Sequence, residues 1–324
     1  MAADTLESAF DPSAIEADCR EFLERFAAAT AGAPSAVNTP ISLLREARAR
    51  GTAVLPAPVR LDTGESLEIP GPAGPIALRI FRPDVSKGGY LHFHGGGFVM
   101  GGPDQQDLML EAIARGTGLT VVSAGYRLAP EHNFPAAPED GIVAARWFLA
   151  QAQTGAFGGD SHIIGGESAG AYLAVQTLLR LRDEGRADAF CASVLTYGAY
   201  DLSLTPSARN WGERYAIIST PILRKYLTMF LPSDADPTSA EISPLYADLS
   251  GLPKALFMVG TMDPLLDDSL FMAQRWRAAG NSAELAVYAG GIHAFNAFPI
   301  GIGRRATHRQ LAFMKMAIES KVED

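Results

Sequence analysis

The segment Gly166 to Gly170 reads Gly-Glu-Ser-Ala-Gly and constrains the fold more than any other stretch of the chain. The short apolar run at 162–165 predicts a buried strand, and the apolar run at 171–181, free of Pro and Gly, predicts a helix. A serine between such a strand and helix lies on a sharp turn, where glycines on either side avoid crowding. The pattern therefore predicts that Ser168 is a nucleophile presented at the carboxyl end of a sheet. A solvated serine in a tight turn is the alternative.

Three glycines follow a second predicted strand. Residues 90–93 read as the strand, and His94 then precedes Gly95, Gly96 and Gly97. Backbone N–H groups in such a run are uncovered and can stabilise the oxygen that gains charge in a tetrahedral intermediate. The N–H of Ala169 would add a donor. A flexible turn is the alternative, but a nucleophile downstream favours an oxyanion hole.

A serine nucleophile needs a base, and His293 fits that role best. It follows the strand-like run 283–289 and a Gly290-Gly291 hinge, which places it on a loop at a strand end. His92 and His94 flank Phe93 on one strand and suggest a metal pair, but no third ligand is evident. We expect no metal and no cofactor, and we expect His94 to brace the glycine loop. The other histidines are expected to be structural or solvated: His132, His162 and His308.

The group that orients the base is expected to be Asp263. It follows a predicted strand at 255–260, and Pro264 favours an extended backbone before it. Asp267 and Asp268 are rivals, but both lie in the first turn of the next helix, where the helix dipole favours any carboxylate. The order Ser168, Asp263, His293 is that of α/β-hydrolases.

These motifs resemble, in order, those of bacterial esterases of the hormone-sensitive-lipase family. The matching stretches are residues 94–98, 126–132, 166–170, 263–265 and the loop around His293. The resemblance implies an α/β-hydrolase fold, a triad of Ser168, Asp263 and His293, and oxyanion donors at Gly95, Gly96 and Ala169. The chain departs from the usual family pattern at Gly125, Asn133, Glu167, Ala171 and Ala294. None of these departures removes a catalytic group.

The composition favours a single globular enzyme. The 324 residues are 48% hydrophobic, enough to bury a large core, and the net charge of −9 argues against nucleic acid and anionic membranes as partners. No apolar run reaches membrane-spanning length, and the acidic N-terminus lacks a signal-peptide core. The two cysteines, Cys19 and Cys191, give no disulfide framework. We expect a cytoplasmic protein, with a homodimer as a further possibility.

Strand and helix patterns alternate along the body of the chain, which predicts a mostly parallel eight-stranded sheet with helices on both faces. The first two strands are joined by a Pro/Gly turn and suggest an antiparallel hairpin. Strands are expected at 58–69, 76–82, 89–93, 119–124, 162–166, 189–197, 255–260 and 284–289. Helices are expected at 104–116, 138–152, 169–183, 265–279 and 305–320.

Two segments are expected to form a helical cap, as the resemblance implies. Helices that merely pack on the core are the alternative. Residues 1–51 carry two helix starts, at Asp11-Pro12 and at Thr39-Pro40, with Gly51 as a stop. Ile15, Cys19, Phe22, Leu23 and Phe26 then share one helical face. Residues 52–324 form the catalytic domain, in which a second cap segment at about 200–245 breaks the alternation. The substrate pocket is expected to be lined by Phe98, Trp211, Tyr215 and Phe230.

Charged residues outside the triad are interpreted as supports. We expect an ion-pair network in the proline-rich loop 126–140, and we expect Glu167 to hydrogen-bond loop backbone and brace the turn.

Together these features predict a serine carboxylesterase that hydrolyses short- to medium-chain, small-molecule carboxylic esters through an acyl-enzyme. An amidase or lactonase with the same triad is an alternative. So is a non-catalytic small-molecule receptor on this fold, such as the plant gibberellin receptors. Receptors of that type lack the base, whereas His293 is present.

Overall fold

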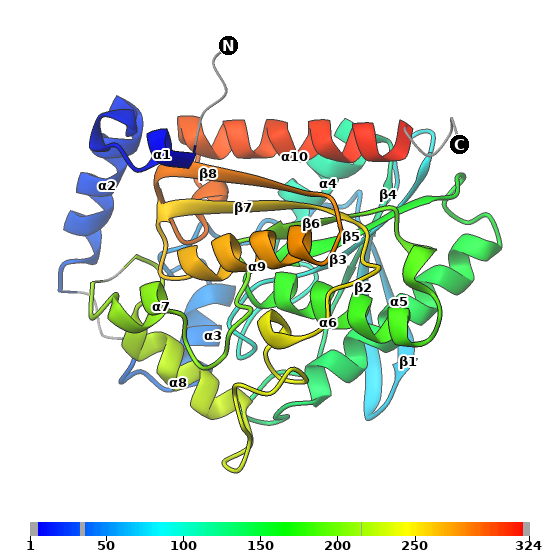
Figure 1. The fold of residues 1–324 in the computed structure, drawn as a ribbon, viewed down its shortest axis with the longest axis horizontal. Coiled ribbons are helices and arrows are strands. Elements are labelled where there is room, and N and C mark those ends of the chain that lie inside the picture. The colour runs from blue at the N-terminus through cyan, green and yellow to red at the C-terminus, as the bar shows by residue number, and fades with distance from the viewer. Residues whose placement is uncertain (1–5, 33–35, 215, 320–324) are drawn as a thin grey trace.

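Eight strands form one sheet at the centre of the molecule, in the order β1-β2-β4-β3-β5-β6-β7-β8 (Figure 1). The computed structural model describes residues 6–32, 36–214 and 216–319. The predicted eight-stranded α/β-hydrolase sheet is confirmed. The strands are β1 (Glu65–Gly71), β2 (Gly74–Phe81), β3 (Gly88–Phe93), β4 (Thr120–Ala124), β5 (Ser161–Glu167), β6 (Ala192–Thr196), β7 (Lys254–Met262) and β8 (Ala283–Ile292).

The sheet is parallel except at β2, which runs antiparallel to β1 and β4. The expected hairpin is present, with Glu65 opposite Ile80 and Gly71 opposite Gly74. The first strand was expected from residue 58 but begins at Glu65. Residues before it form a loop, because the carbonyl oxygens of Leu61 and Gly64 accept hydrogen bonds from the Arg79 side chain instead of from a neighbouring strand.

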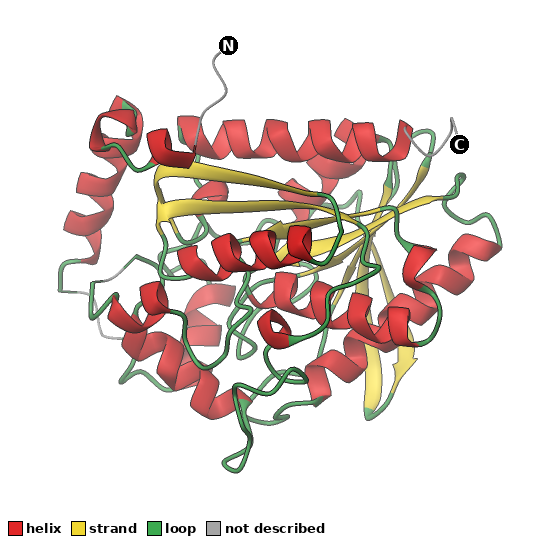
Figure 2. Ribbon diagram, in the orientation of Figure 1, coloured by secondary structure: helices red, strands yellow, loops and turns green. Residues whose placement is uncertain are grey.

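Helices cover both faces of the sheet (Figure 2). One face carries α4 and α10, whose apolar side chains share a core cluster with β3, β4 and β7. The other face carries α5, α6 and α9. No helix in the described part of the chain is long and apolar enough to cross a bilayer. The bounds are α4 (Asp107–Thr117), α5 (Ala136–Gln153), α6 (Ala169–Asp183), α9 (Leu266–Ala278) and α10 (Gly301–Glu319), with short 3-10 turns η2 (Ala187–Ala189), η3 (Pro244–Tyr246) and η4 (Phe295–Ala297).

The N-terminal segment forms short helices on one side of the sheet. After α1 (Leu6–Ala9), Asp11 caps a 3-10 turn, η1 (Pro12–Ala14), by accepting a hydrogen bond from the N–H of Ser13. The chain then extends at Ile15 before α2 (Ala17–Thr30) begins, so the single helix expected from Pro12 is divided in two. Helix α3 (Ile41–Ala49) follows.

The segment at 200–245 contains α7 (Pro206–Asn210) and α8 (Thr220–Phe230). It contacts the N-terminal segment, because the Lys225 ammonium donates hydrogen bonds to the carbonyl oxygens of Ala36 (2.8 Å) and Thr39 (2.5 Å). Helices α3, α7 and α8 lie together at the lower left of Figure 1. These segments are therefore placed where two halves of a cap would meet.

Candidate active site

Ser168 lies on the turn between β5 and α6, as the glycine pattern predicted. Its backbone has φ 55° and ψ −118°, a strained conformation for a residue with a side chain. A Cβ at Gly166 would lie 2.3 Å from the Phe93 carbonyl oxygen, and one at Gly170 would lie 1.9 Å from it. Both glycines are therefore required by close backbone contact.

The side chains of Ser168, His293 and Asp263 form a hydrogen-bonded series. His293 Nε2 lies 3.0 Å from Ser168 Oγ, and His293 Nδ1 lies 2.9 Å from Asp263 Oδ2. Asp263 follows β7 and is fully buried, while His293 follows β8. The other Asp263 oxygen accepts the N–H of Leu265 at 2.9 Å, which fixes the orientation of the carboxylate.

The two rival carboxylates bind elsewhere. Asp267 accepts the N–H of Ser207 at 2.8 Å. Asp268 is buried and accepts hydrogen bonds from the Thr205 hydroxyl and from two backbone N–H groups. Burial raises the pKa of Asp268 to about 7 in spite of these hydrogen bonds. Neither contacts the His293 ring, so the structure brings Asp263 alone of the three to the histidine.

The glycine run lies beside the serine turn. A Cβ at Gly95 would meet the Glu167 carbonyl oxygen at 3.0 Å and Ser168 Cβ at 3.6 Å. The N–H groups of Gly95 and Gly96 donate no hydrogen bond to the described part of the chain. Ala169 is the first residue of α6, where backbone N–H groups lack an acceptor within the helix. Three N–H groups near Ser168 are thus available to a ligand.

His94 holds the start of this loop. Its Nδ1 donates a 2.8 Å hydrogen bond to the Gly95 carbonyl oxygen, and its ring stacks on Tyr126 with the centroids 4.2 Å apart. The Tyr126 hydroxyl donates to the His94 carbonyl oxygen. Burial lowers the pKa of His94 to about 4, so the ring is neutral at neutral pH.

Glu167 contacts side chains, whereas we expected it to contact loop backbone. Its carboxylate accepts hydrogen bonds from His92 Nε2 at 2.8 Å and from the Gln106 amide at 3.2 Å. The second ring nitrogen of His92 contacts the Ser123 hydroxyl at 2.9 Å. The prediction failed because His92, on the adjacent strand β3, offers a ring nitrogen to the buried carboxylate. Within 6–32, 36–214 and 216–319, no group of three potential metal ligands is found.

A pocket of about 1150 Å³ opens at Ser168. Phe98 lines it, as predicted, but Trp211 and Phe230 do not. Phe230 is fully buried and stacks on Phe98 with the centroids 3.9 Å apart, so it supports the wall from behind. Trp211 instead donates to the Arg214 carbonyl oxygen and packs near Phe26. Tyr215 lies outside the described residues.

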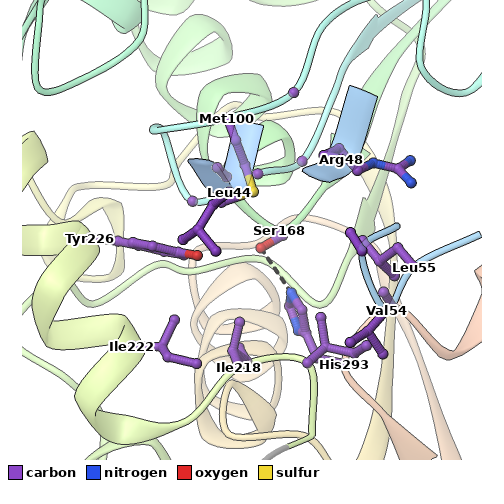
Figure 3. A pocket seen from close by; sticks show the side chains of 18 of the residues that line it. Leu44, Arg48, Val54, Leu55, Met100, Ser168, Ile218, Ile222, Tyr226 and His293 are labelled. Carbon is purple, nitrogen blue, oxygen red and sulfur yellow. Dashed lines mark hydrogen bonds between the residues drawn. The ribbon is translucent and has the colours of Figure 1, made fainter. Parts of the chain in front are cut away.

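The pocket walls come from both helical segments (Figure 3). In this view Tyr226 and Ile222 of α8 lie on one side of Ser168, and Arg48, Val54 and Leu55 lie on the other. Sequence reasoning did not assign these residues to the pocket, because no local pattern shows which face of α8, or which part of the irregular segment 50–64, turns towards the serine. Further lining side chains drawn near Ser168 are Leu44, Met100 and Ile218.

Tyr197 was also missed as a neighbour of the base. Its ring centroid lies 4.7 Å from that of His293, and its hydroxyl donates to the Asn296 side chain at 2.6 Å. The ring therefore limits the positions open to the imidazole.

Arg45 anchors α3 to the body of the protein. Its guanidinium donates to the carbonyl oxygens of Val99 and Ala129 and pairs with Glu131 at 2.8 Å. Arg127 pairs with Asp140 and Glu139, so the ion pairs expected in loop 126–140 are present. The expectation did not include Arg45, which extends the network to the N-terminal segment.

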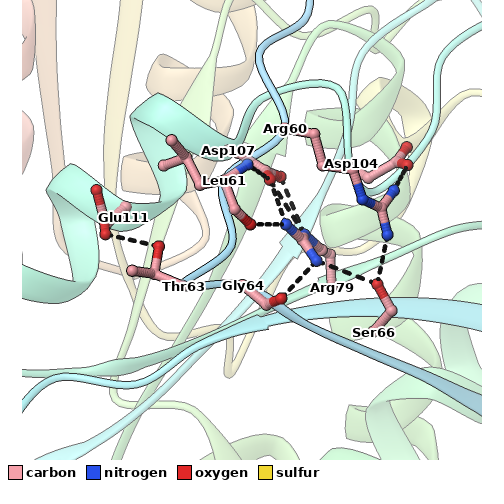
Figure 4. A network of polar contacts seen from close by, with 9 residues as sticks. All are labelled: Arg60, Leu61, Thr63, Gly64, Ser66, Arg79, Asp104, Asp107 and Glu111. Carbon is pink, nitrogen blue, oxygen red and sulfur yellow. Dashed lines mark hydrogen bonds and ion pairs between the residues drawn. The ribbon is translucent and has the colours of Figure 1, made fainter.

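A second arginine anchors the other end of the pocket wall (Figure 4). Arg79 of β2 is buried and pairs with Asp107 of α4 at 2.5 Å, while it also donates to the carbonyl oxygens of Leu61 and Gly64. Asp107 in turn accepts the N–H of Leu61. The segment between α3 and β1 is thus fixed at both ends.

The fold agrees with comparisons to known proteins. A family model described as the α/β-hydrolase fold matches residues 90–297. The chain belongs to this family. LipN, a carboxylic ester hydrolase of Mycobacterium tuberculosis, is 35% identical over 268 residues, which cover 79% of this chain and 70% of LipN. An acetyl esterase of Salmonella choleraesuis is 31% identical over 236 residues, covering 72% of this chain and 73% of that protein.

Solved structures give the same result. The Pyrobaculum calidifontis esterase superimposes with a TM-score of 0.82 at 30% identity and covers 94% of this chain and 99% of its own. A hormone-sensitive lipase from a metagenome library gives a TM-score of 0.80 at 28% identity, covering 93% and 98%. The resemblance to hormone-sensitive-lipase esterases is confirmed, and the α/β-hydrolase described here is a carboxylic ester hydrolase.

Proposed function

We propose that this hydrolase cleaves short- to medium-chain carboxylic esters through an acyl-enzyme formed on Ser168. The observation that supports this most directly is the series of hydrogen bonds from Asp263 through His293 to Ser168, at 2.9 Å and 3.0 Å. A serine hydroxyl is a weak nucleophile unless an adjacent base takes its proton, and these distances fit that transfer.

In the first half of the reaction, Ser168 Oγ attacks the ester carbonyl while His293 Nε2 accepts the hydroxyl proton. His293 then returns the proton to the departing alcohol, which leaves the acyl group on Ser168. In the second half, His293 activates water, which hydrolyses the acyl-enzyme. Asp263 keeps the proton on Nδ1 of His293 and stabilises the ring when it is charged.

The N–H groups of Gly95, Gly96 and Ala169 would stabilise the negative oxygen of both tetrahedral intermediates. The first two donors lie on the glycine loop beside Ser168, and the third begins α6, whose dipole also favours negative charge at that end. The hydrogen bond from His94 Nδ1 to the Gly95 carbonyl oxygen holds this loop in place before substrate binds.

Residues 1–51 and about 200–245 act as the two parts of a cap over the catalytic domain. The contact of Lys225 with Ala36 and Thr39 supports this arrangement, as does the pocket wall that both segments supply. Such a cap closes the pocket to a finite size, which favours short acyl chains.

Labelling with a fluorophosphonate probe tests the nucleophile. The wild-type protein is expected to be labelled at Ser168, and Ser168→Ala is expected to abolish labelling. Ser219→Ala serves as the matched control, because Ser219 also lines the pocket but does not contact His293. Labelling that persists in Ser168→Ala would contradict the proposed nucleophile.

A pair of substrates with one acyl group separates the proposed esterase from an amidase. p-Nitrophenyl butyrate is expected to be hydrolysed much faster than butyryl p-nitroanilide, since the phenolate leaves far more readily than the anilide. A higher kcat/KM for the anilide would contradict the esterase proposal and favour the amidase.

A further inference from the structure

One cationic side chain in the pocket wall has no role in the mechanism above. Among the described residues that line the pocket, Arg48 is the only lysine or arginine. It lies in the last turn of α3, and in Figure 3 it lies on the side of Ser168 opposite Tyr226.

The Arg48 guanidinium is incompletely satisfied within the described part of the chain. Its one hydrogen bond there runs from Nη1 to the Pro56 carbonyl oxygen, and no carboxylate pairs with it. A guanidinium has five N–H donors, so several remain available. The neighbouring arginines differ, because Arg45 pairs with Glu131 and Arg50 pairs with Glu46.

None of the acidic side chains that line the pocket, among the described residues, forms an ion pair with Arg48. Asp107 is paired with Arg79, Glu167 accepts hydrogen bonds from His92 and Gln106, and Asp201 accepts one from Tyr246. The remaining acidic residue of the lining, Glu213, is exposed.

The surroundings of Arg48 are largely apolar. Val54 and Leu55 lie on the same side of Ser168, and partial burial lowers the pKa of the guanidinium. A cation beside apolar groups binds an anion more strongly than one in bulk water, because the interaction is less screened. The planar guanidinium also matches the two oxygens of a carboxylate.

We propose that Arg48 binds a carboxylate carried by the substrate, so that the preferred esters are anionic. This inference rests on the proposed esterase function and names the substrate class of the same site. The carboxylate belongs either to the acyl part, as in a half-ester of a dicarboxylic acid, or to the alcohol part, as in an ester of a hydroxy acid.

Two pairs of esters test the proposal and separate these sources. Monoethyl adipate and ethyl hexanoate differ by a carboxylate at the end of the acyl chain, and 4-butyryloxybenzoate and phenyl butyrate differ by one on the alcohol. Acid release is measured by pH-stat for the wild type and for Arg48→Met, Arg48→Lys and Arg50→Met. Arg50 is the matched control, since it follows the same helix, is exposed and does not line the pocket.

For one of the two pairs, Arg48→Met is expected to lower kcat/KM of the anionic ester at least about ten-fold more than that of the neutral one. Most of the loss is expected in KM, because the contact forms in the ground state as well as in the transition state. Arg48→Lys is expected to retain part of the preference, and Arg50→Met to retain all of it.

The two proposals fail in different ways. Equal losses on the anionic and neutral members of both pairs, or no loss, would overturn the role of Arg48 and leave it as a side chain that holds Pro56. Wild-type protein without activity on any of the four esters would instead overturn the proposed esterase function. Thermal melting of each variant identifies any loss that comes from unfolding.

Discussion

The Nε2 atom of His293 lies 3.0 Å from Oγ of Ser168, although 125 residues separate them along the chain. Ser168 follows β5 and His293 follows β8, with β6 and β7 between these strands. Parallel strands end at the same edge of a sheet, so the sheet order alone brings both loops to that edge. The turn at Ser168 and the Asp263 carboxylate then set the distance.

This arrangement predicts that the triad acts as a unit. Ser168→Ala and His293→Ala are each expected to lower kcat by roughly 10⁴- to 10⁶-fold, and the double variant is expected to be little worse than either. The proton transfer needs both partners, so removing the second costs little more. Steady-state kinetics with p-nitrophenyl butyrate measures the effect, and thermal melting checks the fold. If Ser168→Ala kept a tenth of the wild-type rate, the assignment would be wrong.

Asp263→Asn is expected to lower kcat on the order of 10⁴-fold. The amide favours the wrong tautomer of His293, with the proton on the nitrogen that must accept it from Ser168. Asp267→Asn is the control, because Asp267 is the next acidic residue along the chain. Among the described residues its carboxylate accepts one hydrogen bond, from the Ser207 N–H. A larger loss in Asp267→Asn than in Asp263→Asn would transfer the orienting role to Asp267.

Gly96→Ala is expected to remove most of kcat. Gly96 has φ 131°, and a Cβ there would lie 2.0 Å from the Met100 carbonyl oxygen. The loop must therefore move, and its N–H groups no longer point at the oxygen that gains charge. Gly102→Ala is the matched control in the same loop, since its Cβ meets the Asp104 carboxylate only at 3.3 Å. Similar kcat values for the two variants would argue against a fixed oxyanion hole at Gly96.

The buried His94 predicts a pH dependence of stability. On folding, the pKa of His94 falls from the ordinary 6.5 to about 4. Its contribution to the free energy of unfolding is therefore fully present above pH 6.5 and is lost as the pH falls towards 4. Asp268, whose pKa is raised to about 7, has the opposite effect, because it stabilises the folded chain as the pH falls through this range. Urea unfolding of both the wild type and His94→Asn cancels the effect of Asp268 and leaves that of His94.

The free energy of unfolding of the wild type relative to His94→Asn is expected to fall by about 2 kcal/mol between pH 7 and pH 4.5. The unfolded chain binds a proton at His94 over this interval, whereas the folded chain does not. A difference that stays constant with pH would mean that burial does not hold the ring neutral.

The sequence was most informative where the backbone itself is constrained. The glycines around Ser168, and Gly95 and Gly96, are dictated by contacts under 3.1 Å with neighbouring backbone, so they are visible as local patterns. The alternation of strands and helices likewise reflects burial on both faces of the sheet. Two predicted boundaries were wrong. The first strand does not begin at residue 58, because the distant Arg79 side chain binds the carbonyl oxygens before Glu65. The helix expected from Pro12 is interrupted, because the backbone is extended at Ile15.

The pocket could not be read from the sequence in the same way. Trp211 and Phe230 were expected in it because they are large and aromatic. Phe230 instead stacks on Phe98 in the core, and Trp211 packs against the cluster of Phe26, Ala216 and Ile292. Tyr226 lies one turn before Phe230 on the same face of α8, and it lines the pocket beside Ser168. Which turn of α8 reaches the pocket depends on how the helix packs against the rest of the protein, which no local pattern records.

The length of the acyl chain is expected to determine how fast this hydrolase cleaves an ester. The kcat/KM for p-nitrophenyl esters is expected to rise by up to about four-fold for each methylene that the pocket buries, to peak below about ten carbons and then to fall. Tyr226 forms part of the limiting wall, because its ring packs so closely on the glycine loop that a Cβ at Gly97 would lie 2.4 Å from it. Emulsified long-chain triglycerides are expected to be poor substrates, without activation at the interface.

Tyr226→Ala tests the wall directly. The variant is expected to shift the optimum to longer chains, because the space of the ring becomes available to the acyl group. Trp211→Ala is the matched control: it also removes a large aromatic side chain from the 200–245 segment, but one that does not line the pocket. Its optimum is expected to stay where the wild type has it, even if its melting temperature falls. Wild-type activity that still rises at palmitoyl length would mean that the pocket sets no limit, and the protein would then act as a lipase on long-chain esters.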